Sequence, residues 1–258
     1  YNANGTISSI CEHKTYANGW ITFYDDSFIK AATLRWARGE INGVAYFYNE
    51  KGKKITKGRY KDSRPYKGLM PAMPALGRRN QHTFIRYNHG KSTGLTKFYA
   101  SGRKAMTGVF DNTYYDLASA RYYSENGKLI GTCFYSGNLP VQGAHVEYYS
   151  KTFRAYTPAV VKYIETYVDS SLTERRSFTP HGEYLGSCTF KYGAPLEGKW
   201  LREKTLETYR NGQLDGEVVD WSDDLLRKSY SYNIHNGMKH GPTSYFHPTS
   251  DSVFVGNY

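Results

Sequence analysis

The chain has 258 residues, 39% of them hydrophobic, and carries 34 Lys and Arg against 23 Asp and Glu, a formal charge of +11. Its mean hydropathy is -0.67 and it has no run of about 18 apolar residues, so we predict no membrane-spanning helix. With 26 Tyr and 25 Gly, the composition favours short strands and turns over helices.

Paired aromatic residues followed by turn residues recur along the chain. The copies begin at Phe23, Phe47, Phe98, Tyr122, Tyr148, Phe178 and Tyr245, in stretches such as FYNEKGKK, FYASGRK and YYSENGK. Asn-Gly favours a tight hairpin turn, because both central residues of such a turn adopt positive φ. Each copy is therefore predicted to form strand, turn and strand.

A closing residue, usually Gly, sets the period of the repeat. The units begin near residues 19, 43, 68, 94, 118, 143, 169, 198, 216 and 241, with Ala118 and Asp169 placed by spacing alone. Most intervals are 24 to 26 residues, while one is 29 and one is 18. This regularity predicts about ten repeats of ~25 residues in a single domain, 1–258. The shortest interval predicts a unit that has lost a turn or part of a strand.

The repeats are expected to depend on one another, because a lone hairpin is only marginally stable in water. Stacked neighbours can bury each other's aromatic faces. Two strands per unit at ~4.8 Å would make ten units on the order of 100 Å long, and strand twist would curl them. The predicted fold is all-β: an elongated, twisted single-sheet array of about ten β-hairpin repeats.

Two segments break the pattern. Residues 69–82 contain two Pro and two Met, and because Pro removes a ladder donor we expect this insertion to leave the sheet as a loop. A second irregular insertion near residues 155–177 accompanies the 29-residue interval. Insertions in a repeat array often lie on the binding face, which makes these segments candidates for the functional site.

The predicted partner-binding residues lie in the first insertion. Met73 and Leu76 are apolar anchors beside Arg78 and Arg79, a combination typical of a protein contact patch. The alternative is a loop that only covers the sheet.

Three stretches resemble MORN repeats, in the variant found in bacterial antitoxin and immunity-type proteins: GVAYFYNEKGK from Gly43, YYSENGKLIGTCFYSG from Tyr122 and YRNGQLDG from Tyr209. The resemblance covers nearly the whole chain. It implies a non-catalytic protein that binds and blocks a partner toxin. Because the family also includes membrane-associated scaffolds and appendages of enzymes, this function is an expectation by analogy.

The sequence offers little support for catalysis. It contains no nucleophile elbow, Walker loop or dinucleotide fingerprint. The acidic pairs Asp25/Asp26 and Asp223/Asp224 fall at predicted hairpin tips, where turn chemistry accounts for them. The histidines within residues 235–247 match no metal-ligand spacing. We therefore expect no enzymatic activity, no catalytic residues, no cofactor and no metal.

The three cysteines are predicted to be free thiols. Cys133 and Cys188 occupy equivalent positions two repeats apart, roughly 20 Å, whereas a disulfide needs Cα atoms within about 7 Å. Cys11 belongs to the first unit and is farther away. Free thiols slightly favour the cytoplasm, but the absence of an initiator Met permits a processed exported protein, so the compartment stays open.

The positive charge favours an anionic partner. Basic and aromatic residues interleave in RYKDSRPYKG (59–68), although a solvated sheet face has the same pattern, and the basic residues are expected to spread over all units. We expect an acidic protein surface, such as that of a toxin, ahead of an anionic membrane, with nucleic acid last. The alternative functions are a structural or adaptor subunit of a secretion, phage or envelope complex, and a peripheral scaffold on anionic membrane.

Replacing Arg78 and Arg79 by Glu is predicted to leave folding intact and to weaken partner binding, because the change reverses the charge of the contact patch. A pull-down with the natural partner measures this effect. Unchanged affinity would count against the patch.

Overall fold

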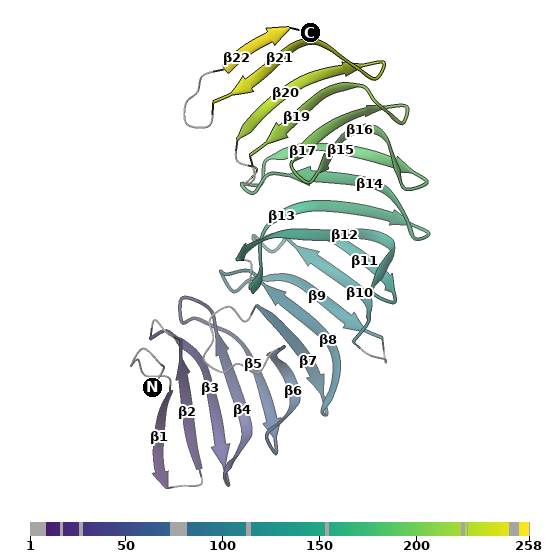
Figure 1. Ribbon diagram of the computed structural model, residues 1–258. Helices are drawn as coiled ribbons and strands as arrows, with labels where there is room; N and C mark the ends of the chain where they lie inside the picture. Colours follow the sequence, from purple (N-terminus) through teal and green to yellow (C-terminus); the bar gives the residue numbers. More distant parts are fainter. Residues whose placement is uncertain are drawn as a thin grey trace. The chain divides into compact units, whose positions relative to one another are not determined.

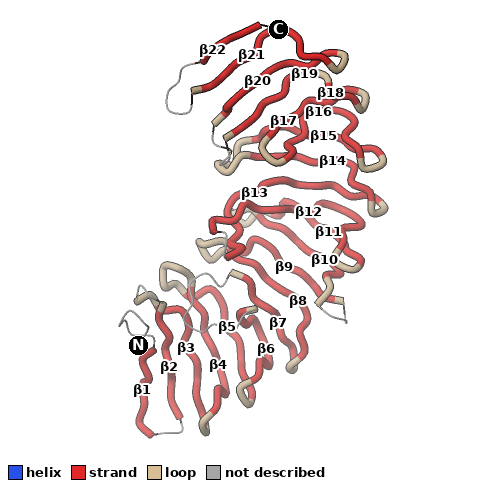
Figure 2. Tube along the Cα trace, in the orientation of Figure 1, coloured by secondary structure: helices blue, strands red, loops and turns tan. Residues whose placement is uncertain are grey.

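A computed structural model describes residues 9–15, 18–25, 28–72, 82–111, 115–152, 155–222, 225, 227–247 and 253–257, with backbone alone over 9–15, 150–152 and 155–159. These residues form 22 β-strands in one sheet, whose neighbouring strands pair antiparallel (Figures 1 and 2). The predicted all-β class of hairpin repeats is confirmed. Within the described chain, no helix has the length and apolarity needed to cross a membrane.

The chain divides into two compact units, residues 1–138 with 150–159 and residues 139–149 with 160–258. The first unit contains β1 (Ser9–Thr15), β2 (Asn18–Tyr24), β3 (Lys30–Ala37), β4 (Glu40–Tyr48), β5 (Lys54–Lys61), β6 (Arg64–Pro71), β7 (Thr83–Asn88), β8 (Lys91–Phe98), β9 (Lys104–Phe110), β10 (Leu117–Tyr123) and β11 (Leu129–Ser136). The strands β12 (Leu139–Thr152) and β13 (Ala155–Val168) contribute residues to both units. The second unit continues with β14 (Ser171–Phe178), β15 (Tyr184–Lys191), β16 (Ala194–Arg202), β17 (Thr205–Arg210), β18 (Gln213–Leu214), β19 (Gly216–Trp221), β20 (Lys228–His235), β21 (Met238–Phe246) and β22 (Val253–Asn257). The single-domain boundary 1–258 stays a prediction.

Two kinds of turn connect the strands. The first is a two-residue turn with positive φ at both residues, as at Asp62 (50°) and Ser63 (60°). The second spans five residues, as in 124–128, where the Ser124 N–H donates to the Lys128 carbonyl and only Gly127 has positive φ (88°). The register shifts by one residue just before this turn, where Tyr122 pairs with Gly131 and Tyr123 with Leu129, which leaves Ile130 as a bulge in β11.

The Asn-Gly pair of YYSENGK was predicted to form a tight turn with two positive φ angles, and this is wrong. Asn126 keeps a negative φ. Its side chain stabilises the wider turn instead, because Oδ1 accepts the Lys128 backbone N–H at 3.1 Å. The two-residue turn of this repeat is Gly137-Asn138, with φ of 55° and 66°.

Turns of neighbouring repeats are hydrogen-bonded to one another along both edges of the sheet. On the edge of two-residue turns, a turn N–H donates to a carbonyl early in the preceding unit: Ser63 to Ile41 (2.9 Å), Gly90 to Tyr66, Ser170 to Val141 and Gly212 to Leu196 (2.8 Å each). On the other edge, Asn49 Nδ2 donates to the Ser101 carbonyl (3.3 Å), Tyr99 OH to Tyr123 (2.5 Å) and Tyr149 OH to Phe178 (2.8 Å). Neighbouring repeats are therefore hydrogen-bonded to each other along both edges of the sheet.

The closing glycines of the repeat have a steric reason. Gly68 (φ +92°) and Gly198 (φ +106°) adopt a backbone that disfavours a side chain, and an added Cβ would lie 2.8 Å and 2.2 Å, respectively, from carbonyl oxygens of the neighbouring strand. Asp169, placed as a closing position by spacing alone, instead lies in a two-residue turn with φ +48°. At Gly68 and Gly198, therefore, any side chain would clash with the backbone of the adjacent strand.

Neighbouring hairpins build a shared core in each unit. In the first unit, the Phe84 ring packs edge-on against Phe47 and Phe98, with centroids 5.7 and 5.4 Å apart. In the second unit, Leu201 and Leu206 pack with Val219 from another strand. The expected burial of aromatic faces between repeats is confirmed. Cys133 and Cys188 are free and fully buried, as predicted for these two thiols.

The predicted insertions differ from the structure in two places. Residues 69–71 stay in β6 and pair with β7, where Met70 is buried, because strand pairing and core burial there outweigh the loss of one proline donor. Residues 155–168 and 171–177 belong to β13 and β14, so this segment is strand rather than a loop. The 29-residue interval arises because Asp169, from which it was counted, lies in a turn and not at a closing position within a strand. The repeat between Gly198 and Gly216 is the short one. A tight connection joins its strands β16 and β17 where other repeats have a five-residue turn, in agreement with the 18-residue interval.

Gly198→Ala is predicted to lower the free energy of unfolding by about 3 kcal/mol, because it combines an unfavourable φ with a backbone clash. Gly193→Ala is the matched control: its φ is +78°, but nothing lies within 4 Å of the added Cβ. The control is expected to cost about 1 kcal/mol. Urea unfolding of both variants measures the difference, and equal losses would contradict the steric explanation.

Candidate functional site

The residues predicted to bind a partner, Met73, Leu76, Arg78 and Arg79, lie outside the described residues, in the segment between β6 and β7. Their role stays a prediction. The described part of the first unit nevertheless contains another candidate surface, which begins with the distribution of charge.

Positive charge is concentrated in the first unit. That unit has 23 Lys and Arg against 9 Asp and Glu, a formal charge of +14, whereas the second has 11 against 14, a charge of -3. Residues 30–67, which run from the start of β3 into β6, hold 11 Lys and Arg against 3 Asp and Glu. The expectation that basic residues spread over all units is therefore wrong, since the sequence showed the repeats but not their division into two bodies.

Strand alternation places three of these cations on one face of the sheet. In β5, the exposed Lys57, Arg59 and Lys61 alternate with the buried Gly58 and Tyr60. Because side chains of a strand point alternately to opposite faces, the buried residues face the core and the three cations face solvent.

The pairing of neighbouring strands places further cations beside those of β5. Arg59 pairs with Lys67 of β6 on one side and with Val44 of β4 on the other. Arg35 of β3 lies across the bulge at Gly43, whose added Cβ would be 3.0 Å from the Arg35 Cδ. A glycine at this position therefore lets the arginine lie along the same face. Strand spacing puts Arg35 about 10 Å from Arg59 in backbone position.

Aromatic rings hold the cations in place. Trp20 and Tyr46 stack with centroids 6.0 Å apart, and the Lys54 ammonium lies 5.0 Å from the Tyr46 centroid. Lys30 lies 5.4 Å from the Tyr48 ring in the same way. Such contacts stabilise a cation by roughly 0.5–1 kcal/mol at exposed sites and limit its motion. The basic face is defined by these residues: Trp20, Lys30, Arg35, Tyr46, Tyr48, Lys54, Lys57, Arg59, Lys61 and Lys67.

The second unit contains two buried glutamates with the same surroundings. Arg175 Nε donates to Glu165 Oε1 (2.9 Å), and Tyr167 OH donates to Oε2 (3.0 Å). Arg202 and Tyr209 donate to Glu207 in the same pattern, at 2.9 and 3.0 Å. Both Glu side chains are only 7% exposed.

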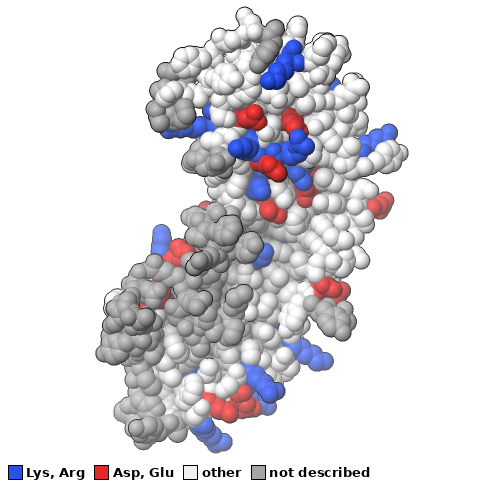
Figure 3. All heavy atoms as spheres, viewed as in Figure 1, with Lys and Arg blue, Asp and Glu red and all other residues white. Residues whose placement is uncertain are grey.

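In the sequence, both buried glutamates belong to a repeated Glu-Thr-Tyr, at 165–167 and 207–209. This motif lies within strands, so the pattern of hairpin turns does not reveal it. Each carboxylate is already paired and hydrogen-bonded, as burial requires, which suits a structural role. Acidic and basic side chains gather side by side over β14–β19 in Figure 3. Unlike the basic face, this surface neutralises its own charge.

The described residues contain no group of three potential metal-ligating side chains. No protein-family model matches the chain, and no curated protein matches it. Among solved structures, the chain is similar to one described as "Crystal Structure of TcdB2-TccC3-TEV", with 12% identity and a TM-score of 0.16. That alignment covers 96% of this chain, which spans 16% of the other. Similarity at this level supports no functional argument, and the resemblance to MORN repeats stays a prediction.

Burial, followed by the hydrogen bond to Glu207, raises the pKa of Tyr209 from 10.0 to about 12. The folded state therefore keeps this proton where the unfolded state releases it. The stability from this group is complete below pH 10 and is lost as pH rises towards 12.

Tyr209→Phe is expected to reduce the fall in unfolding free energy between pH 9 and pH 11, measured by urea titration at each pH. Tyr192→Phe is the control, because Tyr192 is 95% exposed, and it should show the wild-type fall. An identical fall in wild type and Tyr209→Phe would contradict the assigned role of the Tyr209 proton.

Proposed function

We propose that this chain is a non-catalytic protein-binding repeat protein whose basic face docks on an acidic protein surface. The alignment of Arg35, Arg59 and Lys67 on strands of one sheet carries the proposal. A sheet holds its side chains at fixed spacing, so these cations lose little freedom on binding. Opposite potentials would also accelerate the encounter, because the first unit carries a net charge of +14.

The arrangement of the aromatic rings favours a protein partner over single-stranded nucleic acid. A nucleic-acid groove offers free aromatic faces on which bases stack. Here Tyr46 already contacts Trp20 and Lys54, and Tyr48 contacts Lys30. The rings therefore position cations, which suits binding to carboxylates.

The more specific proposal is an antitoxin or immunity-type protein that covers a toxin. Its support is the resemblance of the repeats to MORN proteins of that kind, together with the basic face. A structural or adaptor subunit is the alternative, and it would use the same face within a permanent complex. Peripheral attachment to anionic membrane would draw on the same charge.

Arg35→Glu combined with Arg59→Glu is expected to weaken partner binding at least about tenfold, since both changes place like charges opposite an acidic surface. The partner is first isolated by affinity purification from the native source, and its affinity is then measured at low and high salt. Lys191→Glu combined with Lys228→Glu is the control, because it changes the net charge equally in the second unit.

Equal loss in both double variants would show that only net charge matters, and would contradict a specific basic face. A partner whose binding is unaffected by Arg35→Glu with Arg59→Glu would contradict it as well. Binding of the wild type to anionic vesicles in flotation, with no protein captured, would support the membrane alternative instead.

The antitoxin proposal has a separate test, in which the product of a neighbouring gene is expressed with and without this chain. Growth arrest that the wild-type chain relieves, and that the Arg35→Glu with Arg59→Glu variant does not, is the expected result. A neighbouring product that is harmless alone would contradict the antitoxin proposal and leave the binding proposal standing.

A further inference from the structure

An exposed arginine lies among apolar side chains on the solvent face of β9–β11. On β10, Ser119 and Arg121 point away from the face on which Ala120 is buried. Strand pairing places Val109 of β9 and Phe134 of β11 on either side of Ser119. Val109 is 50% exposed and Phe134 is 53% exposed. An apolar side chain therefore stands on each side of a small polar one.

Two more cross-strand rows complete the surroundings of Arg121. In its own row, Arg121 pairs with Thr107 of β9 and Thr132 of β11. In the following row, Tyr123 pairs with Leu129, which is 51% exposed. Adjacent rows on one face of a sheet are about 7 Å apart, within reach of an arginine side chain. We define the arginine patch as Val109, Arg121, Leu129 and Phe134.

The charge of Arg121 has no counter-charge within these strands. The strands β9, β10 and β11 contain no Asp or Glu. Within the described part of the chain, the Arg121 side chain takes part in no hydrogen bond and no ion pair. A guanidinium is always charged in proteins, and it can hold a carboxylate through two parallel hydrogen bonds. The arginine patch thus combines an unused cation with exposed apolar surface.

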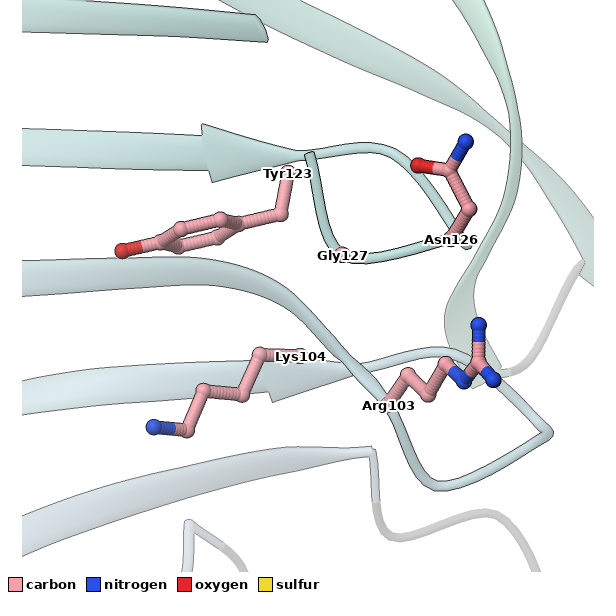
Figure 4. A pocket seen from close by; sticks show the side chains of 5 residues that line it. All are labelled: Arg103, Lys104, Tyr123, Asn126 and Gly127. Atoms are coloured by element: carbon pink, nitrogen blue, oxygen red, sulfur yellow. The ribbon is translucent and has the colours of Figure 1, made fainter. Parts of the chain in front are cut away.

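A hollow of about 330 Å³ adjoins the patch at Tyr123. The residues that line it are Arg103, Lys104, Tyr123, Asn126 and Gly127 (Figure 4). The polar ends of Arg103, Lys104 and Asn126 point in different directions, so they do not converge on one ligand. We assign no ligand to the hollow, and Arg121 is the cation that this surface offers to a partner.

The equivalent positions of the second unit differ from the arginine patch. Strand pairing relative to the two buried cysteines makes Arg176 of β14 the counterpart of Arg121. The Arg176 Nε lies 3.9 Å from the Glu174 Oε1, so this arginine already has a carboxylate beside it. Thr189 takes the place of Phe134. The combination of an unpaired arginine and apolar neighbours is therefore not a general property of the repeat.

We propose that the arginine patch binds an Asp or Glu side chain of the protein partner, while apolar side chains of that partner cover Val109, Leu129 and Phe134. The inference rests on the proposed function, binding of an acidic protein, and adds a contact of another kind. Cations of the basic face stay in solvent, where salt screens them. A carboxylate on Arg121 is enclosed by apolar side chains, and exclusion of water strengthens the pair.

The first test is an NMR titration of the full chain with three capped tripeptides: Leu-Glu-Leu, Leu-Gln-Leu and Gly-Glu-Gly. The backbone amide signals of Arg121 and Thr132 are expected to shift with Leu-Glu-Leu and to saturate on the order of millimolar. The peptides that lack the carboxylate or the leucines are expected to bind at least about fivefold more weakly. The signals of Arg176 and Ser187, the counterparts in the second unit, should stay unchanged.

The second test compares matched variants, with Leu-Glu-Leu and with the acidic partner isolated from the native source. Arg121→Gln is expected to weaken binding about tenfold or more, and the loss should persist at high salt, because the enclosed pair is screened little. Arg176→Gln is the control at the equivalent position. Phe134→Ala is expected to weaken binding about fivefold. Phe254→Ala is its control, because Phe254 is 64% exposed on β22.

The arginine patch and the basic face can fail separately. Weaker partner binding in Arg35→Glu with Arg59→Glu, but not in Arg121→Gln, overturns the patch and leaves the proposed function standing. The reverse result supports the patch and contradicts the basic face. Equal shifts with all three peptides, or equal shifts at Arg176, also overturn the patch. Binding to anionic vesicles that Arg121→Gln abolishes assigns this cation to a lipid phosphate instead, and overturns the protein carboxylate.

Discussion

The structure depends on one constraint: two short strands cannot bury an apolar face by themselves. Hairpins in the interior of each unit therefore obtain their core and part of their hydrogen bonding from their neighbours. The Phe84 ring packs between Phe47 and Phe98 of other strands, and Tyr99 donates its hydroxyl to the backbone of the next repeat. Stability that comes from neighbours leaves the solvent-facing positions free to vary.

The two units differ in the charged side chains that they carry. In the first, solvent-facing positions of β3–β6 carry aligned cations that aromatic rings hold in place. In the second, the buried Glu165 and Glu207 are neutralised by arginines within the unit. The proposed docking surface of the first unit consists of these solvent-facing cations, whereas the buried carboxylates of the second unit are paired within it. The same hairpin plan thus carries aligned surface cations in one unit and internal ion pairs in the other.

The sequence predicted the hairpins and their core, but not the type of turn. The period of the closing glycines predicted the hairpins and the core, because Gly68 and Gly198 occupy positions where no side chain fits. Asn126-Gly127 predicted a turn but not its type, which depends on a one-residue bulge in the paired strand. The partner-binding residues expected at 73–79 lie outside the described residues.

The sequence by itself determined the repeat, the all-β class and the excess of positive charge, because these follow from composition and local periodicity. Only the tertiary structure decided which cations share a face and which carboxylates are paired. Those relations join residues on different strands, such as Arg35 with Gly43 or Arg103 with Glu125, and they depend on register and on the stacking of turns. A periodic sequence specifies each repeat, whereas the contacts between neighbouring repeats are decided by the folded sheet.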